Sequence, residues 1–379
     1  MELCQGELLT RSGDRPRASV GPSRDRTRPN TTARLAPTCP QTVLLSILFD
    51  MKLTLGVYLN LNDTWREQLA QLSHDFPDLE IIIGRDNVVT RIAEITALVA
   101  VPMPEEELRK AEKLTALFVP FVGLNHLPHR LLSERGVRVF NVHGNAESVA
   151  ERALALTLAF LGRVVELHKD LQDHETWHGF WVRKGIEDGW SSLYRRPCTI
   201  FGTGAIGREL AQLLHAFGCH VTGYRRSPAL GVPAGFDAVA GSLPEAIAAG
   251  DILFMALPLT PETEGMFGEA ELQAAEGKVL VNVGRGELIQ EQPLYNALKS
   301  GVLRGAALDV WYSYPDAGEE QRSPSPLGIH RLPNVVCSPH IAGFTPQAVD
   351  ANLHETISSL RTFLEGRPMQ NECNLHLLY

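Results

Sequence analysis

The chain has 379 residues, of which 44% are hydrophobic, and a formal net charge of −9 at pH 7. This length predicts two or three domains with ample cores. The acidic balance argues against a nucleic acid or an anionic membrane as a partner held by bulk electrostatics. The six cysteines show neither the density of a disulfide scaffold nor metal-ligand spacing, so we expect reduced thiols, a cytoplasmic location and no metal. Cys198, Cys219 and Cys337 fall in or beside predicted strands, where small buried side chains are expected.

Residues 1–50 differ from the rest of the chain, because they are rich in Arg, Pro, Ser and Thr and lack hydrophobic periodicity. This composition predicts a disordered leader, which is either a dispensable tail or the result of a start codon assigned too far upstream. The apolar stretch 43–49 is too short to span a membrane. A transit peptide is a further interpretation, although Asp14 and Asp25 count against it.

From residue 51 to residue 148, short apolar runs alternate with helical periodicity. We predict strands at 53–59, 79–83, 97–101, 115–119 and 137–141, and helices at 63–73 and 104–112. This alternation is typical of a parallel sheet covered by helices on both faces. The segment from Ser148 to Glu151 has the pattern of a capping box, and it predicts the start of a long helix that crosses into a second domain.

The segment 149–344 repeats this rhythm, with predicted strands near residues 198, 219, 251, 278, 304 and 334. Thr345 and Pro346 then predict the start of a last helix, which Gly366 ends. If this helix returns to the first domain, that domain is discontinuous and consists of 51–148 and 345–379. The active cleft would then lie between it and the domain formed by 149–344.

A glycine-rich turn follows the apolar run 197–201 and precedes the helical pattern of 208–214. In the context of a strand and a helix, such glycines let the backbone approach a pyrophosphate closely. The helix start offers free N–H groups to the phosphates. We therefore predict a dinucleotide site, with a turn that only packs as the alternative; its residues are Gly202, Gly204, Ala205, Ile206 and Gly207.

The end of the next predicted strand bears on which dinucleotide is bound. Arg225 stands 23 positions after Gly202, where a carboxylate would bind the ribose 2′-hydroxyl of NAD. Guanidinium groups bind phosphate oxygens in bidentate fashion, so the basic pair favours NADP, with NAD as the second candidate cofactor. A solvated basic turn is the alternative. The predicted subsite consists of Tyr224, Arg225, Arg226 and Ser227.

Further motifs follow in a fixed order: Val122-Gly123, Asn145 to Glu151, Pro258 to Thr263, Val281 to Gly286, Gly305 to Val310 and Ser338 to Gly343. With the glycine turn, they resemble the D-isomer-specific 2-hydroxyacid dehydrogenase family, which includes glyoxylate/hydroxypyruvate reductases, phosphoglycerate dehydrogenases and formate dehydrogenases. The resemblance covers roughly residues 51–379. It implies an α/β fold with a flavodoxin-like, discontinuous substrate domain and a Rossmann NAD(P)-binding domain.

The resemblance also implies a role for each matching residue. Arg285 would bind the substrate carboxylate and polarise its carbonyl, because a guanidinium matches a 2-oxo acid in planar, two-pronged geometry. His340 would protonate the carbonyl oxygen as hydride arrives and act as the base in reverse, since the pKa of histidine lies near working pH. The backbone N–H groups of Val122 and Gly123 would bind the carboxylate.

Other matching residues have implied roles with structural alternatives. Asn145 matches a substrate-binding position of the formate dehydrogenase branch, or it only begins a helix. Asp309 would line the nicotinamide ribose, or it caps the end of a strand. The resemblance places Pro258, Thr263 and Val283 at the cofactor as well.

One position departs from the family's pattern. Most members have a glutamate five residues after the position of Asp309, where it pairs with the catalytic histidine, whereas this chain has Tyr314. The loss of that carboxylate should lower the proton affinity of His340 and weaken carbonyl reduction at higher pH. Tyr314 either orients His340 through its hydroxyl or only packs, and an acidic residue of 316–320 is a candidate substitute.

We therefore predict an NAD(P)-dependent oxidoreductase that interconverts small 2-oxo acids and D-2-hydroxy acids, with NADPH preferred and glyoxylate or hydroxypyruvate as first candidates. The alternative is a nicotinamide-binding regulator similar to the C-terminal-binding-protein corepressors. Formate oxidation is disfavoured, because residue 314 is not glutamine. The aromatic segment from Trp177 to Trp190 is more apolar than a surface connector should be. Together with the resemblance, it predicts a homodimer.

Overall fold

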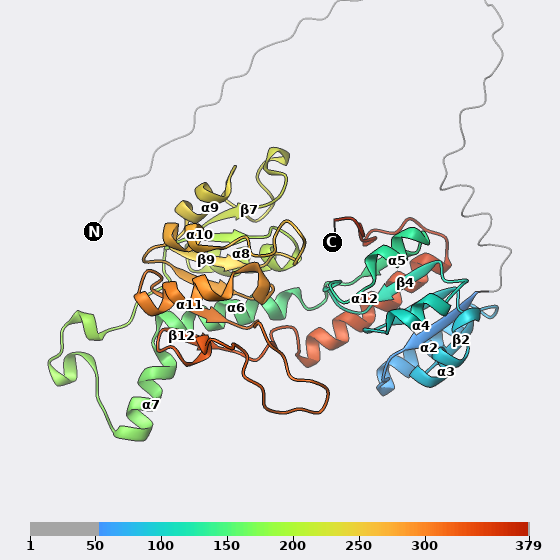
Figure 1. Ribbon diagram of the computed structural model, residues 1–379, viewed down its shortest axis with the longest axis horizontal. Helices are drawn as coiled ribbons and strands as arrows, with labels where there is room; N and C mark the ends of the chain where they lie inside the picture. The colour runs from blue at the N-terminus through green and yellow to red at the C-terminus, as the bar shows by residue number, and fades with distance from the viewer. Residues whose placement is uncertain (1–52, 378–379) are drawn as a thin grey trace, which may run out of the picture. The chain divides into compact units, whose positions relative to one another are not determined.

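The structure is a computed structural model that describes residues 53–377. The predicted leader at residues 1–50 lies outside the described residues. In the described part, the chain forms two parallel sheets, each covered by helices (Figure 1). The prediction of an α/β fold with two parallel sheets, each covered by helices, is therefore confirmed.

The first sheet has five parallel strands in the order β2-β1-β3-β4-β5, which is the flavodoxin-like order. Its strands β3 and β4 are buried along their whole length, as expected when helices cover both faces of a parallel sheet. In chain order the elements are β1 (Thr54–Tyr58), α2 (Asp63–Asp75), β2 (Glu80–Ile83), α3 (Arg85–Thr90), η1 (Ile92–Glu94), β3 (Ala97–Ala100), α4 (Glu105–Lys110), β4 (Ala116–Val119), α5 (His129–Glu134) and β5 (Arg138–Asn141).

The last helix, α12 (Pro346–Leu364, red in Figure 1), packs against this first sheet. The Thr345 hydroxyl caps its N-terminus, as the sequence predicts. The ring of Phe363 meets Phe118 of β4 edge-on, with ring centroids 5.6 Å apart. Phe118 in turn stacks on Phe140 of β5 at 5.0 Å. The end of the chain therefore shares a core with its first strands.

The second sheet has seven parallel strands in the order β12-β11-β10-β9-β6-β7-β8. The direction in which strands are added reverses between β6 and β9, which is where dinucleotides bind in such sheets. The elements are α6 (Ala146–Leu161), α7 (Val164–His174), η2 (Gly179–Val182), η3 (Ile186–Asp188), β6 (Pro197–Phe201), α8 (Ala205–Ala216), β7 (His220–Tyr224), η4 (Pro228–Leu230), β8 (Ala238–Val239), α9 (Leu243–Ala249), β9 (Ile252–Met255), α10 (Glu269–Ala274), β10 (Val279–Asn282), η5 (Gly286–Leu288), α11 (Glu291–Ser300), β11 (Gly305–Leu308), η6 (Ile329–Arg331) and β12 (Val335–Cys337).

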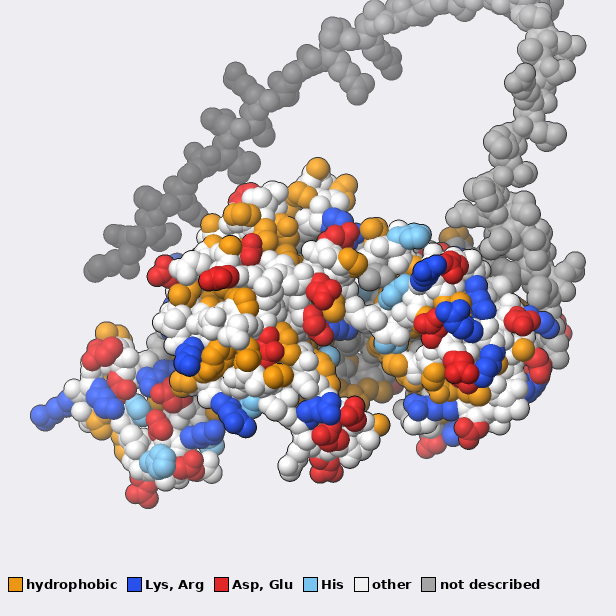
Figure 2. Space-filling model, in the orientation of Figure 1, with side chains coloured by type: hydrophobic (Ala, Val, Ile, Leu, Met, Phe, Trp, Pro, Cys, Tyr) orange, Lys and Arg blue, Asp and Glu red, His pale blue; other side chains and the backbone are white. Residues whose placement is uncertain are grey.

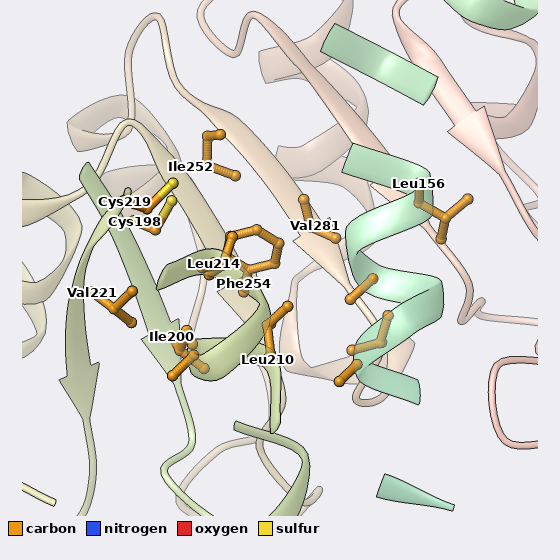
Figure 3. Close-up of a cluster of buried hydrophobic side chains, with 14 of the residues drawn as sticks. Leu156, Cys198, Ile200, Leu210, Leu214, Cys219, Val221, Ile252, Phe254 and Val281 are labelled. Carbon is orange, nitrogen blue, oxygen red and sulfur yellow. The ribbon is translucent and has the colours of Figure 1, made fainter. Parts of the chain in front are cut away.

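Side chains from α6, α8 and the central strands of this sheet form one buried cluster (Figure 3). Cys198 and Cys219 lie inside it as small buried side chains, as predicted. Cys337 is exposed, so the prediction of burial was wrong for this residue. It ends the edge strand β12, which has a neighbouring strand on one side only.

The start of α6 differs from the prediction. The helix begins at Ala146, with Asn145 at the position before it, so the predicted capping box at Ser148 was wrong. The Ser148 hydroxyl instead lies 2.9 Å from the hydroxyl of Thr345. A capping-box pattern inside a helix therefore serves a tertiary contact, which links the start of α6 to the start of α12.

The surface of the described part gives two further observations. No helix within residues 53–377 is long and apolar enough to cross a membrane. On the face shown in Figure 2, basic and acidic side chains are interspersed. That face therefore presents no extended field of a single sign.

Candidate active site

The turn between β6 and α8 has the geometry that its glycines predict. Gly202 has a φ of +109°, and a Cβ at this position would lie 2.5 Å from the carbonyl oxygen of Ala256. A Cβ on Gly207 would overlap the carbonyl oxygen of Gly202. A Cβ on Gly204, by contrast, would meet no atom within 4 Å. Two glycines are thus required by packing, and the third leaves open space at the turn.

The start of α8 is suited to an anion. No side chain caps it, and the first N–H groups of a helix lack intrahelical partners. The N–H groups of Ala205 and Ile206 therefore point out of the helix start, where the helix dipole favours negative charge. With the open space at Gly204, this arrangement fits the pyrophosphate of a dinucleotide.

Two arginines follow β7, as predicted, but both already have partners. Arg225 donates from Nη2 to the carbonyl oxygen of Gly231 at 2.7 Å, while its buried Nε has no partner within the described residues. Arg226 Nη2 lies 2.6 Å from Glu262 Oε2 in the loop after β9. A carboxylate that the sequence analysis did not consider therefore reaches the predicted 2′-phosphate subsite.

The loop after β9 is fixed by its own hydrogen bonds. The Thr263 hydroxyl donates to the carbonyl oxygen of Pro258 at 2.7 Å and accepts from the N–H of Thr260 at 2.8 Å. Val283 is buried and donates its N–H to the carbonyl oxygen of Met255. These contacts shape the loop, and the roles of Pro258, Thr263 and Val283 toward a cofactor stay predictions.

Arg285 follows β10 in a turn held by Asn282. The Asn282 side chain donates to the carbonyl oxygen of Arg285 at 2.9 Å and accepts from the N–H of Gly284 at 3.0 Å. Burial lowers the pKa of the Arg285 guanidinium, which nevertheless stays protonated. Among residues 53–377, no carboxylate forms an ion pair with it. A desolvated guanidinium without a counter-ion is a ready site for a carboxylate.

The segment after β4 contacts this guanidinium. A Cβ on Gly123 would overlap the Nη2 atom of Arg285, so only glycine permits this approach. The carbonyl oxygen of Val122 accepts a hydrogen bond from the Asn141 side chain at 2.9 Å. The structure thus brings Gly123 to Arg285, and the role of Val122 and Gly123 toward a substrate stays a prediction.

His340 lies in a loop that Asp309 holds. Asp309 directly follows β11 and is 1% exposed. Its carboxylate accepts hydrogen bonds from the Ser338 hydroxyl, from the N–H of Ile341 at 3.3 Å and from the N–H of Ala342 at 3.1 Å. These donors flank His340, whose φ of +56° lies in the left-handed region. The Asp309 carboxylate thus holds the loop that contains His340, and its role toward the nicotinamide ribose stays a prediction.

The His340 imidazole has no hydrogen bond or ion pair to the rest of the described chain. Partial desolvation of the ring lowers its pKa most, although the residue as a whole is exposed, and the nearby Arg285 cation lowers the pKa further. Asp309 and Glu287 act in the opposite direction and do not reverse the shift. The neutral form of His340 is therefore favoured, as expected from the absence of a carboxylate partner.

Tyr314 lies against His340 through its ring. The two ring centroids are 5.2 Å apart at an interplanar angle of 52°. The candidate carboxylate substitutes at 316 and 319 were wrong, because Asp316 and Glu319 pair with Arg322 at 2.9 and 3.1 Å. Tyr314 is therefore the side chain of this loop that meets the imidazole.

Asn145 adjoins the same loop from the start of α6. A Cβ on Gly343 would lie 2.5 Å from Asn145 Nδ2, so the amide packs directly on this backbone. The Oδ1 atom of Asn145 is buried and has no partner within the described chain. The structure leaves this oxygen as an unused acceptor, and its role toward a substrate stays a prediction.

Sequence reasoning missed Trp311, which forms hydrogen bonds to both Ser338 and Tyr314. Its indole N–H donates to the carbonyl oxygen of Ser338 at 2.8 Å, and its backbone N–H donates to the Tyr314 hydroxyl at 3.0 Å. The ring is 3% exposed. A tryptophan three residues after a buried strand was the available signal, because a buried indole N–H needs an acceptor.

Comparison with known proteins identifies the family. Residues 154–342 match the model of the D-isomer specific 2-hydroxyacid dehydrogenase, NAD binding domain. A glyoxylate/hydroxypyruvate reductase of Arabidopsis thaliana is 30% identical over 278 residues, which are 72% of this chain and 80% of that relative. The chain therefore belongs to the D-isomer specific 2-hydroxyacid dehydrogenase family.

Other similar proteins extend this result. A D-3-phosphoglycerate dehydrogenase of Mycobacterium bovis is 31% identical over 298 residues, which are 77% of this chain but 53% of that relative. The chain thus spans about half the length of this and several other curated relatives. The crystal structure of a D-isomer specific 2-hydroxyacid dehydrogenase family protein from Aeromonas salmonicida has a TM-score of 0.69 and 27% identity. The likeness covers 86% of this chain and 100% of that one.

The open space at Gly204 gives a direct test of the dinucleotide site. We expect Gly204→Val to raise the dissociation constant of NADPH at least about tenfold. This change corresponds to the loss of one charge-assisted hydrogen bond. Its thermal unfolding midpoint should stay close to that of the wild type, because the new side chain meets no protein atom. Fluorescence titration with NADPH and thermal unfolding measure the two effects.

Gly202→Val is the contrasting variant. It should lower the unfolding midpoint, because the φ of +109° and the Ala256 carbonyl oxygen leave no room for a side chain. Unchanged NADPH affinity in Gly204→Val would contradict the assignment of this turn to the cofactor.

Proposed function

We propose that the chain catalyses the NAD(P)-dependent interconversion of small 2-oxo acids and D-2-hydroxy acids. The observation that carries this proposal is the half-buried Arg285 guanidinium, which has no carboxylate partner in the described chain and lies close enough to His340 to lower its pKa. A cation for the substrate carboxylate and an imidazole for the proton are what this reaction requires. The names of the curated dehydrogenase and reductase relatives support the same reaction.

Arg285 would bind the substrate carboxylate. Its main chain is fixed by Asn282, so the guanidinium is positioned before a substrate arrives. The N–H groups of Val122 and Gly123 would bind the same carboxylate from the other side. Desolvation strengthens both interactions, because charges attract more strongly where water is excluded.

His340 would move the proton. A bound nicotinamide supplies a hydride for reduction of the carbonyl carbon or accepts it in oxidation. During reduction His340 donates a proton to the carbonyl oxygen, and during oxidation it takes the proton from the hydroxyl, so one hydride and one proton balance the reaction. The pKa of His340 is lowered. The protonated imidazole that reduction needs is therefore lost as pH rises through this lowered pKa. The neutral imidazole that oxidation needs is present at pH values above it.

Removal of the proton donor tests the reaction. We expect His340→Ala to lower kcat by about 100-fold or more, the usual contribution of a general acid or base. Arg285→Lys should chiefly raise KM for the acid, because a point charge cannot make the two-pronged contact. Nicotinamide absorbance with glyoxylate, hydroxypyruvate, pyruvate and longer 2-oxo acids measures both effects and ranks the substrates.

His354→Ala, on the exposed side of α12, is the matched control and should leave kcat unchanged. Cofactor binding without turnover of any acid by the wild-type chain would contradict the enzyme proposal. That result would favour the alternative, a nicotinamide-binding regulator of the same fold, for which the missing carboxylate beside His340 is the specific support.

We also propose that the site prefers NADP. The segment 224–227 offers two guanidinium groups and no carboxylate where the ribose 2′ position is expected. The pairing of Arg226 with Glu262 means that a 2′-phosphate must compete with this carboxylate. Arg225 donates to a neutral carbonyl oxygen, that of Gly231, so its charge is the less compensated of the two.

Reversal of the charge at 225 tests this preference. We expect the wild type to bind NADPH about 100-fold more tightly than NADH, which corresponds to one or two charge-assisted hydrogen bonds. Arg225→Asp should erase or reverse this preference. Dissociation constants of both cofactors measure it, with Arg331→Asp as a control on the exposed surface. Equal preference in Arg225→Asp and in the wild type would exclude Arg225 from the 2′ subsite.

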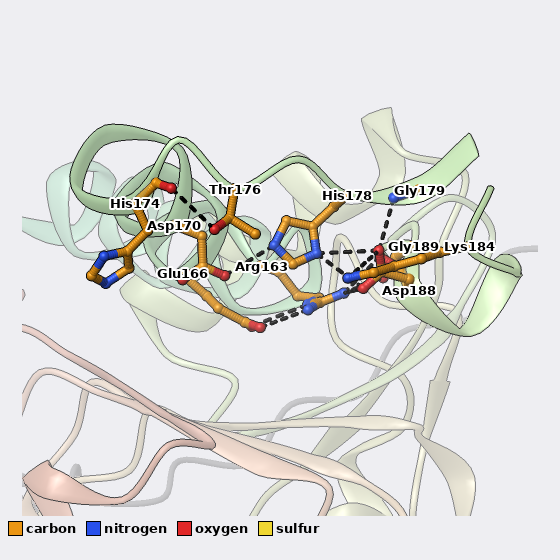
Figure 4. Close-up of polar contacts among 10 residues, drawn as sticks. All are labelled: Arg163, Glu166, Asp170, His174, Thr176, His178, Gly179, Lys184, Asp188 and Gly189. Atoms are coloured by element: carbon orange, nitrogen blue, oxygen red, sulfur yellow. Dashed lines mark hydrogen bonds and ion pairs between the residues drawn. The ribbon is translucent and has the colours of Figure 1, made fainter. Parts of the chain in front are cut away.

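We propose a homodimer on the evidence of the segment that follows α6. No residue of α7 is buried, and the segment after it exposes large apolar side chains: Trp177 58%, Phe180 74%, Trp181 72%, Ile186 94% and Trp190 65%. Such a cluster is characteristic of a protein contact. The segment is nevertheless ordered by polar contacts, in which His178 bridges Asp170 and Asp188 at 3.0 Å each (Figure 4). A preorganised apolar surface loses little conformational entropy when a partner covers it.

The oligomeric state can be measured directly. Light scattering should give twice the mass of the chain for the wild type and a shift toward the single-chain mass for Trp181→Asp, since a charge at a buried contact is costly. Leu230→Asp, equally exposed but in η4, should remain dimeric. A wild-type monomer would contradict the homodimer.

We propose a cytoplasmic location on the evidence of the thiols. The four described cysteines are free, although Cys198 and Cys219 lie together in one core (Figure 3). Thiols are kept reduced in the cytosol.

A further inference from the structure

Within residues 53–377, no hydrogen bond or ion pair holds the imidazole of His340. The charged groups that face it are Arg285 and Glu287 from the segment after β10, and Asp309 from the end of β11. The Asp309 carboxylate accepts hydrogen bonds from the Ser338 hydroxyl and from two backbone N–H groups of the loop. It is therefore not available to the imidazole. Arg285 repels a protonated imidazole, and Glu287 is exposed. None of these groups fixes the direction of the ring.

Tyr314 is the side chain that meets the imidazole directly. Its ring lies 5.2 Å from the imidazole, centroid to centroid. Its hydroxyl accepts the backbone N–H of Trp311 at 3.0 Å, so the ring is anchored at its far end. The indole of Trp311 donates in turn to the carbonyl oxygen of Ser338, two residues before His340. A continuous set of contacts thus runs from the loop to Trp311, to Tyr314 and back to the imidazole.

The surrounding loop gives this arrangement rigidity. The carbonyl oxygen of Tyr314 accepts a hydrogen bond from Arg322 Nη1 at 3.0 Å. Arg322 also pairs with Asp316 and Glu319, which removes these carboxylates from the vicinity of the imidazole. Tyr314 is 39% exposed, and its partial desolvation raises the pKa of the phenol, so the hydroxyl stays neutral at working pH.

We propose that Tyr314 is a positioning residue, whose anchored ring holds the His340 imidazole in its working orientation and does so without supplying a negative charge. The kinetic part of this inference rests on the proposed function, whereas the contact itself does not. An ion pair would both orient the ring and stabilise its protonated form, and an aromatic ring does only the first. The site would therefore orient its proton carrier while leaving it a weaker base than a paired histidine.

A spectroscopic experiment tests the contact without any turnover. The full chain, labelled with carbon-13 at histidine Cε1, is titrated with acid by NMR, and His340→Gln identifies the His340 signal. The ring current of Tyr314 should displace this signal, so Tyr314→Phe should keep the displacement and Tyr314→Leu should lose it. Tyr314→Glu should raise the midpoint of the His340 titration by about one pH unit or more, the usual effect of an adjacent opposite charge.

A kinetic experiment tests the consequence. Tyr314→Leu should lower kcat by about 30-fold while the dissociation constant of NADPH stays unchanged, because a small misorientation of a catalytic group has large effects. Tyr314→Phe, which keeps the ring but loses its anchor to Trp311, should lose about threefold. Tyr314→Glu should move the falling limb of reduction upward in pH. Tyr295→Leu, in α11, is the matched control and should leave kcat and the pH profile unchanged.

The outcomes separate the two proposals. An identical His340 signal in Tyr314→Leu and in the wild type, or an unchanged titration midpoint in Tyr314→Glu, would overturn the inference even if the chain is an active enzyme. Absence of turnover in the wild type, with the NMR effects present, would overturn the proposed function and leave the contact established. Loss of the ring-current displacement together with loss of kcat in Tyr314→Leu supports both.

Discussion

The buried carboxylate of Asp309 organises the carboxyl-terminal edge of the second sheet. A carboxylate that is 1% exposed is stable only if donors surround it, and here a hydroxyl and two N–H groups of one loop do so. The loop thereby holds His340 in a left-handed conformation that a free loop would rarely adopt. Because Asp309 directly follows β11, which pairs with β10 on one side and β12 on the other, the position of His340 is set by the sheet itself.

The same edge gathers the other groups of the site. In a parallel sheet, all strands point the same way, so the segments that follow them lie at one edge. The glycine turn follows β6, the Glu262 loop follows β9, Arg285 follows β10 and Asp309 follows β11. Close backbone packing fixes these segments against one another, as the overlap between a Cβ at Gly202 and the Ala256 carbonyl demonstrates.

The electrostatics of the site are those of a cation without its counter-ion. Arg285 is desolvated and unpaired in the described chain, and its charge helps to keep His340 neutral. Tyr314 adds contact without charge. The site therefore combines a cation that lacks a carboxylate partner in the described chain with an imidazole whose pKa is lowered.

The sequence by itself determined the alternation of strands and helices, the glycine turn and the Thr345 cap, and its family resemblance singled out Arg285 and His340 as candidates. These features depend on neighbouring residues or on a fixed local spacing, which the sequence displays directly. It misplaced the start of α6, offered Asp316 and Glu319 as partners of His340, and overlooked Trp311 and Glu262. Only the tertiary structure decided that Arg322 takes those carboxylates, that Glu262 pairs with Arg226 and that Asp309 holds the His340 loop. Each of these contacts joins side chains from segments whose separation is set by chain folding, and no local pattern specifies which of several possible partners a charged group will meet.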